Sequence, residues 1–118
     1  MEQKEFRLIL STEADQFLIS LPQKVADKIR YNIRRVQKGE HDPKLFKKLG
    51  DTEIWEFRTL YNKMAYRLFS FWDTEKETLV IATHGIVKKK QKTPQKEIAK
   101  AQEFRRKYFA NNKKIWNR

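Results

Sequence analysis

The spacing of apolar residues changes along the chain, and this change separates predicted helices from predicted strands. From Val25 to Val36 the apolar residues occupy positions 25, 29, 33 and 36, which is the spacing of an amphipathic helix. Pro22 suits the first turn of this helix. A shorter helix precedes it, with Ser11 or Thr12 as its N-cap. Because the link between the two helices is very short, we expect an antiparallel helical hairpin.

Other segments are short, apolar and rich in β-branched or aromatic residues, which is typical of strands. They are Phe6–Leu10, Ile54–Leu60, Met64–Trp72 and Thr78–His84. A last helix is expected from Thr93 as N-cap and Pro94 as first residue. The order βααβββα predicts an α+β fold in which an antiparallel sheet carries the helical hairpin on one face, with a C-terminal helix. We expect one domain over residues 1–118, with residues 111–118 as a flexible tail.

Composition narrows the classes of function. The chain has 118 residues, no Cys and two His, which excludes a disulfide framework and a thiol nucleophile and argues against a transition-metal site. We therefore expect neither a metal nor another cofactor. The sequence also has no signal-peptide pattern and no apolar run of the length that a membrane helix needs. A cytoplasmic protein without a membrane partner is expected.

The charge is large and unevenly distributed. The formal net charge is +12, which points to an anionic partner such as nucleic acid. Residues 84–118 contain 12 Lys or Arg and only 2 Asp or Glu, whereas residues 1–83 contain 15 and 13. The densest basic run follows the last predicted strand and comprises Lys88, Lys89, Lys90 and Lys92. The run is either a phosphate-binding patch or a solvated segment.

A hairpin between the second and third strands would bring two arginines together. In either register of a two-residue turn at positions 61–63, Arg58 and Arg67 share one sheet face, opposite or diagonal to each other. Two neighbouring arginines repel, so the arrangement favours an anion between them. The alternative is that a local carboxylate compensates them, and Glu56 lies on the Arg58 face.

His84 is the one histidine inside a predicted element, and it is the natural candidate for a proton carrier near neutral pH. A structural role is the alternative. No set of carboxylates suits two-metal cleavage of a phosphodiester. Metal-independent cleavage of RNA needs only an aligned 2′-hydroxyl, proton transfer and cations that stabilise the phosphorane. Arg58, Arg67 and His84 have the required chemistry, and we predict that they are catalytic.

Several motifs resemble those of the phage-derived Gp49-like, HigB-type toxins of the RelE/ParE superfamily: Leu49-Gly50, Ile54–Arg58, Tyr66–Phe69 and His84–Pro94. The resemblance implies the same fold and a metal-independent, usually ribosome-dependent mRNA endoribonuclease that inhibits translation. It also implies neutralisation by a cognate helix-turn-helix antitoxin. By this resemblance Arg58 and Arg67 match the strand arginines, His84 matches the family's histidine, Lys88 and Lys89 match its basic segment, and Lys47 and Lys48 lie near further basic positions of relatives. Together with Lys90 and Lys92 of the same basic run, these lysines are the predicted RNA-binding residues.

Two other functions are compatible with the sequence. A ParE-like protein would poison gyrase and cleave no RNA, and a plain nucleic-acid-binding protein would bind RNA and leave it intact. The chain also departs from RelE, which uses a C-terminal tyrosine at its site. Tyr108 lies on the apolar side of the last predicted helix, so we expect it to pack rather than to act on RNA.

Overall fold

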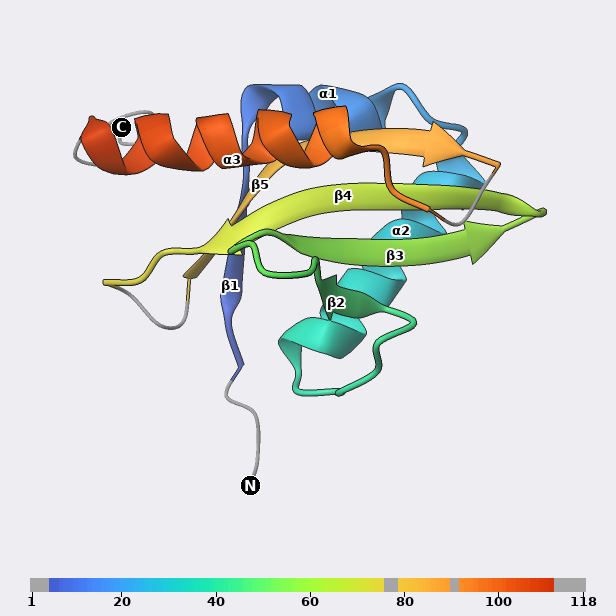
Figure 1. Cartoon of the computed structure of the whole chain (residues 1–118). Helices are drawn as coiled ribbons and strands as arrows, with labels where there is room; N and C mark the ends of the chain where they lie inside the picture. The colour runs from blue at the N-terminus through green and yellow to red at the C-terminus, as the bar shows by residue number, and fades with distance from the viewer. Residues whose placement is uncertain (1–4, 76–78, 90–91, 112–118) are drawn as a thin grey trace.

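The structure is a computed structural model that describes residues 5–75, 79–89 and 92–111. These residues form an α+β fold in which helices lie on both faces of a five-stranded sheet (Figure 1). The elements in chain order are β1 (Arg7–Leu10), α1 (Thr12–Ile19), α2 (Gln23–Gln37), β2 (Phe46–Lys48), β3 (Trp55–Tyr61), β4 (Met64–Trp72), β5 (Leu79–Lys88) and α3 (Gln95–Ala110). The predicted tail lies outside the described residues except for Asn111.

The sheet differs from the predicted one in two respects. Its strand order is β1-β5-β4-β3-β2. β1 pairs with β5 in parallel and the other pairs are antiparallel, so the sheet is mixed and the prediction of an antiparallel sheet was wrong on this point. β2 is an additional edge strand of three residues that the sequence did not predict. Its backbone is held by pairing with β3, which supplies the hydrogen bonds that so short a segment lacks alone.

The turn between β3 and β4 fixes the position of the two arginines. Asn62 and Lys63 have φ angles of 50° and 67°, as a two-residue turn that follows the twist of a hairpin requires. This turn pairs Tyr61 with Met64 and places Arg58 directly opposite Arg67. Of the two predicted registers, the structure adopts the one that brings the arginines closest.

Each face of the sheet has its own apolar core. One core joins α1 and α2 to the sheet through residues such as Leu18, Ile29 and Phe57. The other joins α3 to the opposite face through Ala101 and Tyr108. In Figure 1, α3 crosses one face of the sheet near β5 and β4, and α2 passes behind β3. The hairpin on one face is therefore confirmed, and α3 covers part of the other face.

Each helix begins after an N-cap residue that the local sequence supplies. Ser11 caps α1, since its Oγ accepts a hydrogen bond from the Ala14 backbone N–H at 2.9 Å. Pro22 and Pro94 are the N-cap residues of α2 and α3, one position before the predicted place. The prediction of Thr93 as the cap of α3 was wrong, and its hydroxyl bonds elsewhere, as described below. Within the described part of the chain, no helix has the length and hydropathy needed to cross a membrane.

Candidate nucleic-acid interface

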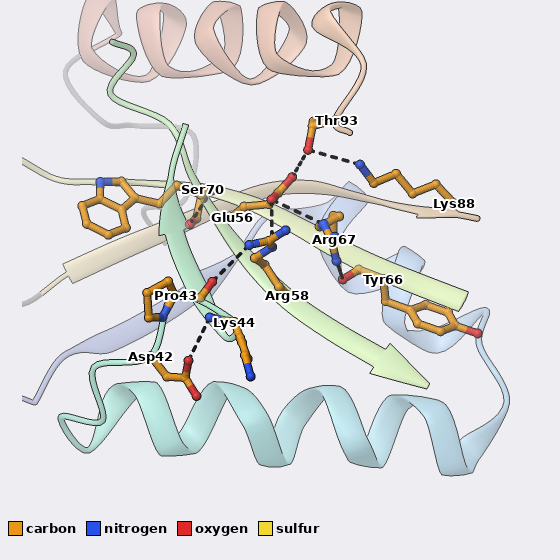
Figure 2. A network of polar contacts seen from close by, with 11 residues as sticks. Asp42, Pro43, Lys44, Glu56, Arg58, Tyr66, Arg67, Ser70, Lys88 and Thr93 are labelled. Carbon is orange, nitrogen blue, oxygen red and sulfur yellow. Dashed lines mark hydrogen bonds and ion pairs between the residues drawn. The ribbon is translucent and has the colours of Figure 1, made fainter. Parts of the chain in front are cut away.

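A single buried carboxylate holds the two arginines of the β3–β4 hairpin. The Nε atoms of Arg58 and Arg67 each lie 3.4 Å from Oε1 of Glu56, whose side chain is 2% exposed. Figure 2 shows the two guanidinium groups converging on this carboxylate. The alternative that a local carboxylate compensates the arginines is therefore correct in part. Among the described residues, one carboxylate thus pairs with two guanidinium groups, and the formal charges of these three side chains sum to +1.

The backbone of neighbouring segments fixes the direction of both guanidinium groups. Arg58 Nη1 donates to the Pro43 carbonyl at 3.1 Å, and Arg67 Nη1 donates to the Tyr66 carbonyl at 3.5 Å. Arg58 keeps 20% of its side chain exposed, whereas Arg67 keeps 4%. Burial lowers the pKa of Arg67, and the nearby Arg58 adds to the effect. Arg58 is thus the more accessible cation of the pair.

Thr93 and Lys88 extend the same network toward α3 (Figure 2). The Thr93 hydroxyl donates a short hydrogen bond to Oε2 of Glu56 and accepts one from Lys88 Nζ at 3.4 Å. Burial lowers the pKa of Lys88, and the charge of Arg67 lowers it further. We call Glu56, Arg58, Arg67, Lys88 and Thr93 the arginine cluster. Its formal charge is +2.

The arginine cluster borders a cleft between the β2–β3 segment and the start of α3. We call it the α3-side cleft. Its volume is about 440 Å³. β2 brings Lys47 directly opposite Glu56 in the sheet. Among the residues that line this cleft are Lys47, Lys48, Glu56, Arg58, Lys92 and Thr93.

The other predicted RNA-binding residues are Lys88, Lys89 and Lys90. None of them is among the described residues that line this cleft. Lys88 is the last residue of β5, since this strand extends four residues beyond the predicted end at His84. Lys89 follows it and is exposed. Lys90 lies outside the described residues. The basic run is thus partly held by a strand, which supports a positioned patch over a freely solvated segment.

His84 lies inside the molecule, beneath α3. It is 2% exposed and its ring stacks on Phe69 at 4.8 Å between centroids. Its Nε2 lies within hydrogen-bond distance of Oε1 of Glu97 on α3, at 2.9 Å, and its Nδ1 lies 2.9 Å from the Thr83 hydroxyl oxygen. Burial lowers the pKa of His84, although the Glu97 bond opposes this. Both ring nitrogens are engaged with protein, which the sequence could not show.

Tyr108 is held away from the arginine cluster, as the sequence predicted. It is 2% exposed in the core beneath α3. Its hydroxyl donates to Oδ2 of the buried Asp73 at 2.8 Å. Burial and this bond raise the pKa of Tyr108 well above its usual value. The residue fastens the end of α3 to the end of β4.

Sequence reasoning missed two functional features of this region. Glu56 was considered only as a local partner of Arg58, whereas it is the centre of the network. Thr93 follows the helix-start pattern so closely that its bond to a strand 37 residues away had no local signal. Across the described residues, no group of three or more His, Asp or Glu side chains is arranged to hold a metal ion.

Comparison with known protein families gives a match over most of the chain. The family model described as "Phage derived protein Gp49-like (DUF891)" matches residues 16–106. The matched range includes both arginines, the whole arginine cluster and most of α3. No curated protein matches the chain.

Proposed function

Since the chain belongs to the family of phage-derived Gp49-like proteins, we propose that it is the toxin of a type II toxin–antitoxin system. Proteins of this family are commonly associated with such toxins. We propose further that the toxin is a metal-independent endoribonuclease that cuts mRNA on the ribosome and so stops translation. A cognate helix-turn-helix antitoxin would neutralise it. The proposed place of action is the cytoplasm.

The observation that carries this proposal is the incompletely compensated arginine pair. Arg58 and Arg67 are directly opposite each other and share one carboxylate. A phosphodiester entering the α3-side cleft would meet Arg58, which lines it, and would add negative charge beside the arginine pair. When the 2′-hydroxyl attacks, the phosphorane gains a further negative charge, and fixed guanidinium groups stabilise this transition state more than the ground state.

The lysines divide into binding and proton-transfer groups. Lys47, Lys48 and Lys92 line the α3-side cleft and are exposed, so they suit contacts to backbone phosphates. Lys89 and Lys90 would extend these contacts along the strand of RNA. Lys88 is linked to the arginine cluster and its pKa is lowered. We propose that Lys88 gives a proton to the leaving oxygen more readily than an exposed lysine would.

The environment of His84 changes the role that we propose for it. A general acid or base must reach the substrate, and His84 is enclosed between Phe69 and the start of α3. We therefore propose that His84 is a positioning residue. Through Glu97 it holds the first turns of α3, from which Thr93 reaches Glu56. A substitution at His84 would then lower activity by moving α3.

Expression of variants tests the proposal. Arg58→Ala and Arg67→Gln should relieve growth arrest, whereas Arg30→Ala, an exposed arginine on α2, should remain toxic. Circular dichroism shows whether each variant folds. Mapping of mRNA 5′ ends after brief induction shows whether cleavage is lost with toxicity.

Other outcomes favour the other functions. Full toxicity of both folded cluster variants would refute the assignment of the site. Intact transcripts together with DNA damage would favour a ParE-like gyrase poison. RNA that is bound, in a strongly salt-dependent manner, and never cut would favour a plain binding protein.

A further inference from the structure

A second basic cleft lies on the other side of Arg58. We call it the α2-side cleft. Its volume is about 330 Å³. It forms because β2 pairs only with Trp55–Phe57, so the second half of β3 extends past the end of β2. The wall that β2 would otherwise provide comes from α2 and from the segment at Lys44 and Leu45.

The inner end of this cleft contains a buried polar pair. Asn32 on α2 and Thr59 on β3 are 5% and 4% exposed. Asn32 Nδ2 donates to Thr59 Oγ1 at 3.1 Å. Oδ1 of Asn32 is buried and has no hydrogen-bond partner among the described residues. A buried polar atom without a partner is unfavourable for folding and calls for an explanation.

The surroundings of Asn32 make its polarity more notable. Its neighbours on the buried side of α2 are Ile29, Ile33 and Val36, and all three pack in the apolar core. An apolar residue at position 32 would extend that core without an unpartnered amide. The amide instead lines a cleft that opens to the surface.

The rest of the α2-side cleft attracts anions. Lys28 and Lys44 are exposed side chains on its outer part. Arg58 and Arg67 also line it, and Arg58 lines the α3-side cleft as well. No carboxylate is among the described residues that line the α2-side cleft. The two clefts are therefore joined through the arginine cluster.

We propose that the α2-side cleft binds one nucleotide of the RNA, adjacent to the phosphate held by the arginine cluster. The phosphate or ribose of this nucleotide contacts Lys28 and Lys44, and its base donates an N–H to Asn32 Oδ1. The volume is near the lower end of the roughly 300–1,000 Å³ of ligand pockets, which suits a single nucleotide. This inference rests on the proposed function and deepens it by naming a contact that selects the base.

The amide oxygen gives the expected preference. With Nδ2 engaged by Thr59, Asn32 presents an acceptor, and exocyclic amino groups of adenine, cytosine and guanine are donors. Uracil has no amino group, and its ring N3–H is flanked by two carbonyl oxygens that would face the amide oxygen. We therefore expect amino-bearing bases to be preferred to uracil at this position.

A binding experiment tests the site without RNA cleavage. The four nucleoside 5′-monophosphates and inorganic phosphate are added separately to ¹⁵N-labelled protein. AMP, CMP and GMP should shift the Asn32 side-chain amide and the Thr59 backbone signals, with smaller shifts for UMP. Inorganic phosphate should shift signals of the lysines and arginines only. Equal effects of phosphate and nucleotides on Asn32 would overturn the assignment of a base site.

Matched variants separate a binding role from a structural one. Asn32→Leu removes the unpartnered amide oxygen and also the bond to the Thr59 hydroxyl, so its urea midpoint is measured first and binding is compared where the variant is fully folded. Its affinity for AMP should nevertheless fall about tenfold, since a hydrogen bond to a buried partner is worth roughly this factor. Lys28→Ala should weaken binding of all four nucleotides, whereas Lys24→Ala, one turn away and outside the cleft, should not. Unchanged AMP affinity in Asn32→Leu would refute the inference.

The two proposals fail in distinguishable ways. Nucleotide shifts at Asn32 in a protein that cuts no RNA would contradict the endoribonuclease and leave the nucleotide site in place. RNA cleavage whose mapped sites are the same for the native protein and Asn32→Leu would contradict the base contact and leave the endoribonuclease in place.

Discussion

Replacing Glu56 by Gln should destabilise the fold while strengthening the binding of anions. The change removes one negative charge and keeps an oxygen that can accept from Thr93. It removes the carboxylate that Arg58 and Arg67 share, and raises the formal charge of the arginine cluster from +2 to +3. The perturbation is therefore almost purely electrostatic.

The magnitude follows from the distances. Each Nε–Oε1 separation is 3.4 Å, which corresponds to a Coulomb energy of about 5 kcal/mol per pair at an effective dielectric constant near 20. Desolvation offsets much of this, and removing one partner of a buried ion pair typically costs about 3–5 kcal/mol. Because Arg58 retains 20% exposure, we expect the lower value, about 3 kcal/mol, and a fall in Tm of roughly 10–15 °C.

Urea unfolding of four proteins measures the effect. They are the native protein, Glu56→Gln, Arg67→Met and the double variant. Arg67→Met removes the buried charge that Glu56→Gln leaves unpaired, so the double variant should be more stable than Glu56→Gln alone. Added phosphate should stabilise Glu56→Gln more than the native protein, because it binds the folded state of the variant more tightly.

An exposed carboxylate provides the control. Glu103 on α3 pairs with Arg106 at 2.7 Å, but both side chains are about half exposed or more. Glu103→Gln should change stability by less than about 0.5 kcal/mol. If Glu56→Gln were as mild as this control, or if the effects of Glu56→Gln and Arg67→Met were additive, Glu56 would not be the counter-charge of the arginine pair.

Three further predictions concern α3 and β5. The pKa of His84 is lowered in the folded protein, so the unfolded chain binds more protons just below pH 6.5. The stability that neutral His84 contributes is present above that pH and is lost as the pH falls toward the folded-state pKa. His84→Gln should therefore flatten the dependence of the urea midpoint on pH. An unchanged slope of this pH dependence would contradict the prediction. A Cβ at Gly85 would lie 2.2 Å from Cδ2 of Phe17, so Gly85→Ala should lower the free energy of unfolding in urea by about 1–3 kcal/mol. Adding Phe17→Ala should recover part of this loss. Equal stability of the single and the double variant would show that this contact is not the cause. Tyr108→Phe removes the bond to buried Asp73 and should lower stability by about 1–3 kcal/mol, measured as a shift in the urea midpoint with an unchanged slope; native stability in this variant would show that the bond is not stabilising.

The parts of the fold that the sequence predicted are those with a local signal. The stripe from Val25 to Val36 and the hairpin around Asn62 needed only neighbouring residues to be interpreted. β2 has three residues and no alternation of its own, because its stability comes from pairing with β3. The parallel pairing of β1 with β5 joins segments about 70 residues apart, and no short-range pattern encodes such a contact.

The sequence likewise predicted those parts of the candidate site that depend on neighbouring residues. The shared face of Arg58 and Arg67 follows from the period of a strand and the length of a turn, but the sequence left two registers open, and the structure selects the one that pairs them directly. The enclosure of His84 does not, since it depends on where α3 docks and on a carboxylate 13 residues away. The sequence did not identify Asn32 as a candidate site residue, for a related reason. Its position on the buried side of α2 is clear from spacing, but the cleft beside it exists only because β2 ends early.

The ratio of one carboxylate to two arginines reconciles folding with binding in this protein. Without Glu56, Arg67 would be a nearly buried cation that has lost its ion pair with this carboxylate, which disfavours the folded state. With a second carboxylate the formal charge of the arginine cluster would fall from +2 to +1, and the cluster would attract a phosphate less strongly. One shared carboxylate lets the strands pair and still leaves a net positive charge at the junction of the two clefts. The formal charge of +12 is a property of the whole chain, whereas the proposed selectivity for a phosphate at one place would depend on this local, partial compensation.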